Sequence, residues 1–302
     1  MNPALKHSGK KNAIRISPGE FAYLTVCGLV LVCAFIACIL PFYLIIVNSL
    51  VPAMDLSRNG FQLWPGAFSL DGYRYVLGNG KVFTNYMVSI TVTVCGTALA
   101  TVVTAMFAYG LAHPRVKYRY KISFLTYIPM IMGSGLVGFY LLIVSVLHLN
   151  DTLLALILPY VLSPFNTFIM VSHFRDLPYE LTEAAYIDGA HDGFVFFKIV
   201  WPMSVIPTVT IMLFYALGYW NDWWLANLFI TQSNLKPLQI LIRNIISRQQ
   251  MASIMGSSAN FVMQPLTVQL VTVCITIGPI LLVYPFIQKY FVKGITVGAV
   301  KG

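Results

Sequence analysis

Acidic residues that could take part in chemistry are concentrated in one stretch of this 302-residue chain. Five of its ten Asp and Glu side chains lie there, namely Asp176, Glu180, Glu183, Asp188 and Asp192. Carboxylates at this density could act as general acids and bases, ligate a metal or contact a protein partner. The same stretch contains Ala184, Ala185 and Gly189, and this run of small residues suits docking into a groove better than catalysis. The alternative is a helix lying on the membrane surface, but such helices favour Lys and Arg, and anionic headgroups repel an acidic one.

The local sequence predicts a short helix from Tyr179 to Asp188. Asp176 can cap this helix, and Pro178 suits its first turn. Gly189 can adopt a left-handed conformation and end the helix. A period of 3.6 residues places four side chains on one face, which we expect to dock: Leu181, Ala184, Ala185 and Asp188.

Several other patterns carry no catalytic prediction. Residues 133–138 match the Gly-x-Gly-x-x-Gly dinucleotide pattern, but they lie in an apolar run with no preceding strand, which indicates helix packing or a soft point in a membrane span. The chain has no Gly-x4-Gly-Lys-Ser/Thr motif, so we expect no nucleotide cofactor in it. The five His lack metal-site spacing and the five Cys lie in apolar runs, so we expect no metal site.

The composition is that of an integral membrane protein. Hydrophobic residues make up 58% of the chain, charged residues only 10%, and the mean hydropathy is +0.77. At about 20 apolar residues per crossing, we expect an all-α protein with six transmembrane helices. Their predicted ranges are 21–48, 85–111, 122–147, 152–174, 199–222 and 265–291.

The distribution of basic residues predicts the orientation of these helices. The net charge is +9, yet no basic patch interleaved with aromatics suggests nucleic acid. Most Lys and Arg instead fall in segments that would share one side, which the positive-inside rule makes cytoplasmic. We therefore expect both termini in the cytoplasm, with a cytoplasmic tail at 1–20, a membrane domain at 21–302, a cytoplasmic loop at 175–199 and extracytoplasmic loops at 49–84 and 223–264.

Prolines and small residues predict a packed bundle. Five prolines fall inside predicted spans and favour kinks: Pro129, Pro159, Pro164, Pro207 and Pro279. Small residues at four-residue spacing in the second span would let another helix approach closely: Gly96, Ala100, Thr104 and Ala108.

The acidic stretch resembles the EAA loop of membrane subunits of binding-protein-dependent ABC importers. The resemblance covers Glu183-Ala184-Ala185, Gly189, Ile199 and Pro202, while Trp201 replaces the usual Leu. Further segments look like maltose-type carbohydrate permeases: Asn85 and Ser89, Ala108–Ala112, Ile128-Pro129, Leu158-Pro159, Phe165-Asn166 and Trp220-Asn221-Asp222. The resemblance extends over nearly the whole chain after about residue 20.

This resemblance implies a type I ABC importer permease in a bacterial inner membrane, a non-catalytic subunit that moves an oligosaccharide, complex or acidic, into the cytoplasm. The implied partners are a second, distinct permease subunit, a dimer of a cytoplasmic ATPase that binds ATP and Mg²⁺, an extracytoplasmic solute-binding protein and membrane lipid. The implied ATPase-coupling residues are Glu180, Glu183, Ala184, Ala185, Asp188, Gly189 and Ala190.

Aromatic and polar residues near the outer ends of the spans are candidates for the substrate path. Sugars stack on aromatic rings and hydrogen-bond to amides and carboxylates. The candidates are Asn85, Tyr86, Tyr160, Asn166, Trp220, Asn221 and Asp222. An interfacial aromatic belt is the alternative for the tryptophans.

Two other functional classes are less consistent with the sequence. A self-sufficient channel or ion-coupled carrier would show ionisable groups in mid-span or repeat symmetry, and neither is evident. A membrane enzyme would need a cluster of His or carboxylate groups at one face, and the acidic stretch has docking spacing instead.

Overall fold

The computed structural model describes residues 18–78, 80–133, 135–254 and 266–279, and within these ranges every regular element is helical. The longest elements are α1 (Pro18–Ser49) and α4 (Gly80–Ala112). Two short helices lie between them, α2 (Ala53–Asn59) and α3 (Asp71–Leu77). The remaining elements in the first half of the chain are α5 (Arg119–Ile131), α6 (Leu136–Leu141), a π-helical turn (Leu142–Val146), α7 (Leu154–Ile157) and a 3₁₀ turn (Leu158–Tyr160).

The second half continues with α8 and a set of short helices before the next long rod. These are α8 (Pro164–Arg175), α9 (Tyr179–Ile187), α10 (Asp192–Val195), a second π-helical turn (Phe196–Val200) and α11 (Trp201–Met203). The last elements are α12 (Val205–Asn221), α13 (Trp224–Phe229), α14 (Leu238–Ile254) and an apolar helix at Leu266–Pro279.

Two helices, α1 and α4, are each long and apolar enough to cross a membrane alone. Three further pairs qualify when each bent pair counts as one crossing, which gives up to five among the described residues. The first part of the sixth predicted span is the helix Leu266–Pro279, and residues 280–291 lie outside the described ranges.

The predicted third and fourth spans are bent rather than straight. The segments Arg119–Ile131 and Leu136–Val146 lie at 112° to each other, with Gly135 at φ +71° between them. This is where the sequence predicted a soft point. The segments Leu154–Tyr160 and Pro164–Arg175 meet at 47°, where Pro164 starts α8 and the Ser163 hydroxyl caps it by accepting from the Asn166 N–H.

The predicted fifth span, 199–222, is broken near its start. The straight helix begins at Val205, and the preceding segment Asp192–Met203 runs at 85° to it. Pro207, in the first turn of α12, has no N–H to donate to the preceding turn, which favours a break before it. At the break, the Ser204 hydroxyl donates to the Val200 carbonyl oxygen at 2.8 Å and partly replaces the lost bonding.

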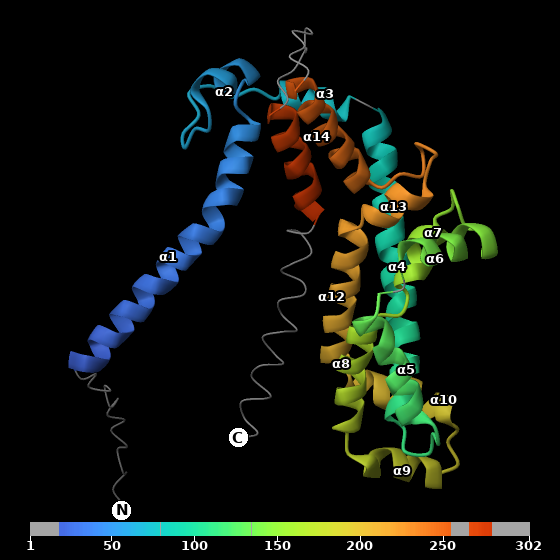
Figure 1. Cartoon of the computed structure of the whole chain (residues 1–302). Helices are drawn as coiled ribbons and strands as arrows, with labels where there is room; N and C mark the ends of the chain where they lie inside the picture. The colour runs from blue at the N-terminus through green and yellow to red at the C-terminus, as the bar shows by residue number, and fades with distance from the viewer. Residues whose placement is uncertain (1–17, 79, 134, 255–265, 280–302) are drawn as a thin grey trace, which may run out of the picture.

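The core of the bundle lies where α4 packs between α8 and α12 (Figure 1). The predicted stripe of small residues is at this contact, because a Cβ on Gly96 would lie 2.7 Å from the Tyr219 ring. About two helical turns further along α4, Thr104 and Tyr215 share a buried hydrogen bond of 2.6 Å. The small side chains of α4 therefore make room for aromatic side chains of α12, as expected for a membrane helix pair.

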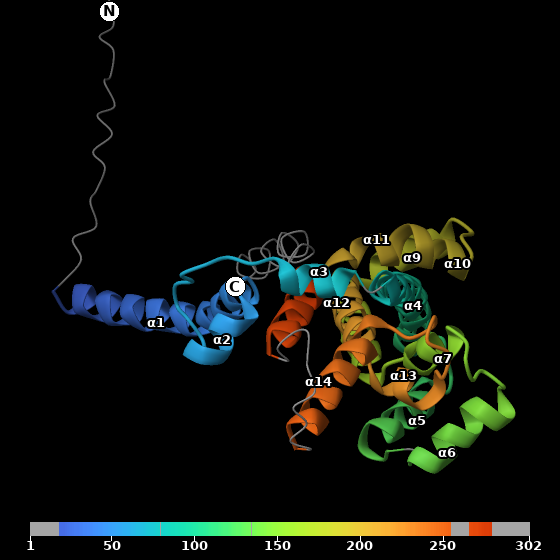
Figure 2. The same cartoon turned by 90° about the horizontal axis from the view of Figure 1, so that it is seen from above.

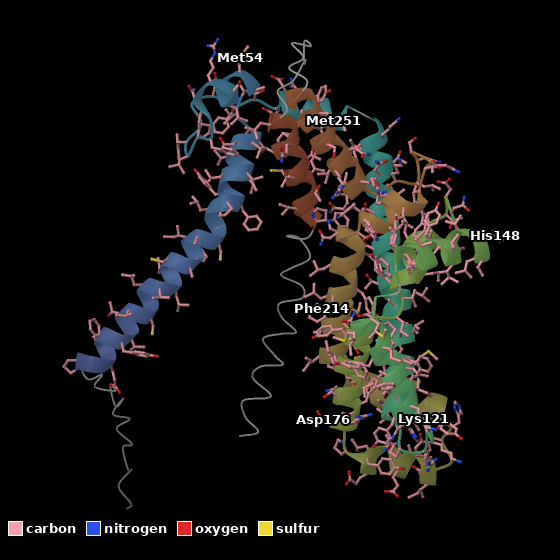
Figure 3. All side chains as sticks on the ribbon, viewed as in Figure 1. Met54, Lys121, His148, Asp176, Phe214 and Met251 are labelled. Carbon is pink, nitrogen blue, oxygen red and sulfur yellow. The ribbon has the colours of Figure 1, made fainter. Side chains whose placement is uncertain are left out.

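Helix α1 stands apart from this bundle along most of its length (Figures 1 and 2). None of its most apolar 18-residue window is buried. It is anchored toward its C-terminal end, where the Asn48 side chain exchanges two hydrogen bonds with the backbone of Gln62 and the Ser49 hydroxyl bonds to the Tyr73 hydroxyl. Most side chains of α1 thus project away from the rest of the chain (Figure 3).

Candidate functional site

Helix α9 carries the EAA residues at one end of the bundle, opposite α2, α3 and α14 (Figure 1). It ends as the sequence predicted, with Gly189 at φ +83°. The Gly189 N–H bonds to the Tyr186 carbonyl at 3.1 Å and the Ala190 N–H to the Ala185 carbonyl at 3.0 Å. These two bonds form a Schellman motif, in which only a residue tolerant of positive φ is unstrained at position 189.

The predicted N-terminal cap of this helix is wrong. Pro178 occupies the cap position of α9 and no side chain bonds to the first turn. Asp176 is instead the C-cap of α8, where its N–H bonds to the Ser172 and His173 carbonyls. Asp176 therefore ends one helix and does not start the next, because three residues, 176–178, separate the helices.

The exposed face of α9 differs in part from the predicted one. Leu181, Ala184 and Asp188 are exposed as expected, but Ala185 turns inward and packs against the core. Ile187 is 80% exposed and adds an apolar side chain that the sequence reading did not include. The exposed side chains that α9 offers to a partner are therefore two acids and small or apolar groups: Glu180, Glu183, Ala184, Ile187 and Leu181.

Tyr186, on the opposite side of α9, was also missed from the sequence. Its hydroxyl lies 2.7 Å from Asp192 Oδ1, 3.1 Å from the Tyr109 hydroxyl and 3.1 Å from His113 Nε2. The Arg115 guanidinium lies 4.4 Å above its ring. These partners are up to 77 residues away in the chain, so no local pattern could reveal the cluster.

Burial and hydrogen bonding shift the pKa values of this cluster. Desolvation raises the pKa of the Tyr186 hydroxyl, and the bonds to Tyr109 and Asp192 raise it further, so the hydroxyl stays protonated. Desolvation lowers the pKa of His113, and the nearby Arg115 and Arg119 charges oppose its protonation, although Asp192 favours it. Both groups are therefore neutral at physiological pH.

A small cavity of about 50 Å³ lies beside the N-terminal half of α9. Tyr179 and Thr182 line it from α9, while Tyr109, His113 and Phe174 line it from the bundle. This half of the helix is therefore less tightly packed than the half that carries Tyr186.

The structure brings together two pairs of the predicted path residues. The Tyr160 hydroxyl donates to Asp222 Oδ1 at 3.2 Å, and the same oxygen accepts the Trp224 N–H. Trp220 is buried and meets the Tyr86 ring edge-on, with ring centroids 5.9 Å apart. Asp222 thus both caps α13 and holds Tyr160.

The three predicted amides are not part of these pairs. Asn85 and Asn166 are each 4% exposed, and their Oδ1 atoms have no hydrogen-bond partner in the described part of the chain. Asn221 is exposed and donates to the Leu217 carbonyl of its own helix. Buried acceptors without partners are costly, so Asn85 and Asn166 are available to water or a ligand in the bundle.

Two features at the end opposite α9 were also missed. Arg243 of α14 stacks on the Trp223 ring with its Cζ 3.4 Å from the centroid, and no carboxylate of the described ranges lies within 4.0 Å of it. The Asp151 carboxylate accepts from the Thr231 hydroxyl, which lowers its pKa most, and from the Thr231 and Gln232 N–H groups at 2.6 and 3.0 Å, which lower it further. Neither Arg243 nor Asp151 is among the site residues that the sequence predicted.

The described residues contain no group of three or more His, Cys, Asp or Glu side chains that could hold a metal ion. Three of the acidic residues at α9, Glu180, Glu183 and Asp188, are exposed. Their exposed positions instead leave them free to contact a partner.

The family model for the inner membrane component of binding-protein-dependent transport systems matches residues 100–297. The chain belongs to this family. The permease is 38% identical over 283 residues to the polygalacturonan/rhamnogalacturonan transport system permease protein YtcP of Bacillus subtilis, covering 92% of this chain and 98% of that protein. It is 39% identical over 265 residues to protein LplC of the same organism, covering 87% and 90%.

A solved structure also matches the permease. A bacterial ABC transporter involved in the import of the acidic polysaccharide alginate contains a chain that superposes with a TM-score of 0.80, at 24% identity, covering 91% of the permease and 98% of that chain. This likeness establishes the fold. Together with the family match, it confirms that the permease is a multi-pass inner-membrane component of an ABC transporter.

Proposed function

We propose that this permease is the membrane-spanning subunit of an ATP-driven importer that moves oligosaccharides into the cytoplasm, and that α9 couples it to a separate ATPase. The observation that carries the proposal is the exposed α9, with its EAA residues and its glycine-terminated end. A short helix with small, acidic and apolar side chains on its outer face is suited to a groove on a partner protein. The chain itself has no P-loop motif, so a partner must supply ATP hydrolysis.

The proposed topology has six spans and cytoplasmic termini, with α9 on the cytoplasmic side. The start of α1 points toward the α9 end of the molecule and α2 lies at the other end, which fits an inward N-terminus (Figure 1). The basic segment 115–121 also lies at the α9 end, between α4 and α5. Basic loops favour the cytoplasmic side, so the two features support the same orientation.

The proposed substrate is an oligosaccharide that carries carboxylates. Two proteins similar to the permease are named for the transport of polygalacturonan and alginate, which are acidic polymers. Arg243 supports this choice because a guanidinium can bind a carboxylate through two parallel hydrogen bonds. Its stacking on Trp223 fixes the plane of the guanidinium and leaves its N–H groups available at the end opposite α9.

The proposed assembly contains a second, distinct permease subunit, two copies of the ATPase and an extracytoplasmic solute-binding protein. Support comes from the family, whose members act with a binding protein. The membrane helices would have two conformations, and the equilibrium between them would be shifted by ATP bound on one side and by sugar-loaded binding protein on the other.

A capture experiment tests the docking role of α9. Tagged permease, co-expressed with its partner subunits, is purified and the retained ATPase is measured. We expect Gly189→Val to reduce retention at least tenfold, because a branched residue at φ +83° disrupts the end of α9. The control is Asp55→Lys, a charge reversal on α2 at the opposite end, which should retain ATPase like the wild type. Equal retention by both variants would refute docking through α9.

Cysteine labelling tests the orientation. In a variant lacking the five native cysteines, Glu183→Cys and Asp55→Cys are exposed in turn to a membrane-impermeant maleimide in spheroplasts. We expect labelling at residue 55 in intact spheroplasts and at residue 183 only after lysis. Labelling of residue 183 before lysis would place α9 outside and overturn the coupling proposal.

A further inference from the structure

The outer face of α9 explains how a partner could dock, but it does not explain how movement of α9 reaches the membrane helices. In the described ranges, Tyr186 is the one side chain of α9 that hydrogen-bonds outside its own helix. The Thr182 hydroxyl also donates a hydrogen bond, but to the Tyr179 carbonyl oxygen of the same helix.

We propose that Tyr186 is the positioning residue that transmits movement of α9 to α4, through a hydrogen-bonded cluster formed by Tyr109, His113, Tyr186 and Asp192. The inference rests on the proposed coupling function and adds the residue through which coupling passes.

The directions of the hydrogen bonds follow from the geometry around His113. The Arg115 N–H donates to His113 Nδ1 at 3.2 Å, so Nδ1 carries no proton. A neutral imidazole then carries its proton on Nε2, which donates to the Tyr186 oxygen. The tautomer is thus fixed by a backbone donor on the far side of the ring.

With that tautomer, the Tyr186 hydroxyl uses its full bonding capacity. It donates its one proton to Asp192 Oδ1, and it accepts from His113 Nε2 and from the Tyr109 hydroxyl. A hydroxyl has one donor and two acceptor positions, and all are filled here. Three partners on one oxygen define the position of α9 relative to α4 and α10.

The partners of this oxygen come from separate segments. Tyr109 lies in the last turn of α4, His113 directly follows α4, and Asp192 begins α10. Helix α10 continues through a π-helical turn and α11 to the break before α12. A displacement of Tyr186 therefore acts at once on α4 and on the segment that leads into α12, the two helices with the closest packing in the bundle.

The packing of α9 supports a pivot at Tyr186. Ala185 and Tyr186 contact the core, whereas Tyr179 and Thr182 border the cavity of about 50 Å³. A force on the outer face can move the N-terminal half of α9 into this space, while the half that carries Tyr186 moves with the bundle.

The test uses Tyr186→Phe, which removes only the hydroxyl, and Tyr179→Phe as the matched control on the same helix. The Tyr179 hydroxyl makes no hydrogen bond within the described ranges. Each variant is reconstituted with its partner subunits in proteoliposomes, with a radiolabelled oligogalacturonide as the transport probe. Three quantities are measured: ATPase retained, ATP hydrolysed and sugar accumulated.

We expect Tyr186→Phe to retain ATPase within twofold of the wild type and to hydrolyse ATP, but to accumulate at least tenfold less sugar per ATP hydrolysed. Tyr179→Phe should keep the wild-type ratio. Asp192→Asn keeps an acceptor oxygen and should preserve more of the ratio than Asp192→Ala.

Two results would overturn the inference. One is a transport-to-hydrolysis ratio in Tyr186→Phe equal to that of Tyr179→Phe. The other is a loss of retained ATPase in Tyr186→Phe that accounts for the whole loss of transport, since this would make Tyr186 a docking or folding residue. Failure of the wild-type permease to retain ATPase would instead refute the proposed function itself.

Discussion

The contact between Gly96 and Tyr219 offers a direct test of the bundle packing. A Cβ at position 96 would lie 2.7, 2.8 and 2.9 Å from three atoms of the Tyr219 ring. Ordinary contact begins near 3.4 Å, so Gly96→Ala requires the ring or α12 to move by several tenths of an ångström. The ring cannot move freely, because it is buried and its hydroxyl donates to the Ile157 carbonyl at 2.9 Å.

The expected cost follows from these contacts. Overpacking a core by one methyl group costs about 1–3 kcal/mol. A weakened hydroxyl bond adds about 1 kcal/mol. The higher helix propensity of alanine stabilises the variant by about 1 kcal/mol. The net loss of folding free energy for Gly96→Ala is therefore about 1–3 kcal/mol.

The assay is thermal unfolding of the purified permease in detergent. Gly110→Ala is the matched control, because it lies on the same helix and a Cβ there has no neighbour within 4 Å. We expect a lower midpoint for Gly96→Ala and an unchanged or higher midpoint for Gly110→Ala. Equal midpoints for the two variants would refute the close packing of α4 against α12.

Two further predictions concern pH and substrate charge. Folding lowers the pKa of His113 below its ordinary 6.5, so its contribution to stability is present above pH 6.5 and is lost as the pH falls below that value. The difference between the unfolding midpoints at pH 5.5 and pH 7.5 should therefore be smaller in His113→Gln than in the wild type. An equal difference in the two proteins would contradict this prediction. Arg243→Gln should lower uptake of an oligogalacturonide at least fivefold and leave uptake of a neutral oligosaccharide of the same length unchanged. Arg243→Lys should give oligogalacturonide uptake between those of the wild type and Arg243→Gln, because Lys lacks the planar pair of donors. Equal losses of uptake for both sugars would contradict a role in carboxylate recognition.

The sequence predicted the elements whose causes are local. Apolar runs located α1 and α4, and Gly189 marked the end of α9 because left-handed backbone at a helix end favours glycine. The stripe that includes Gly96 identified the face of α4 that packs most closely. Each of these signals lies within a few residues of the feature that it produces.

The features that the sequence did not predict depend on contacts between distant segments. The sequence marked Pro207 as a kink but could not show that the chain turns by 85° before α12, because a proline permits a bend without setting its angle. Helical periodicity placed Ala185 on the docking face, but Ala185 packs against the core, next to Tyr186 whose hydroxyl is bonded to the bundle. Tyr186 itself and the Arg243–Trp223 pair gain their partners only when the chain folds.

The turn of 85° at Ser204 gives the α9 end of the bundle a geometric property. The segment Asp192–Met203 forms a short arm, about 18 Å long at 1.5 Å per residue, set across the axis of α12. The end of this arm at Asp192 is hydrogen-bonded to Tyr186. Moving that end sideways by about 2 Å would swing the arm through about 6° and would turn α12 about its own axis. A small sideways shift at the α9 end can thus be converted into rotation of α12 about its axis, without that helix sliding along its length.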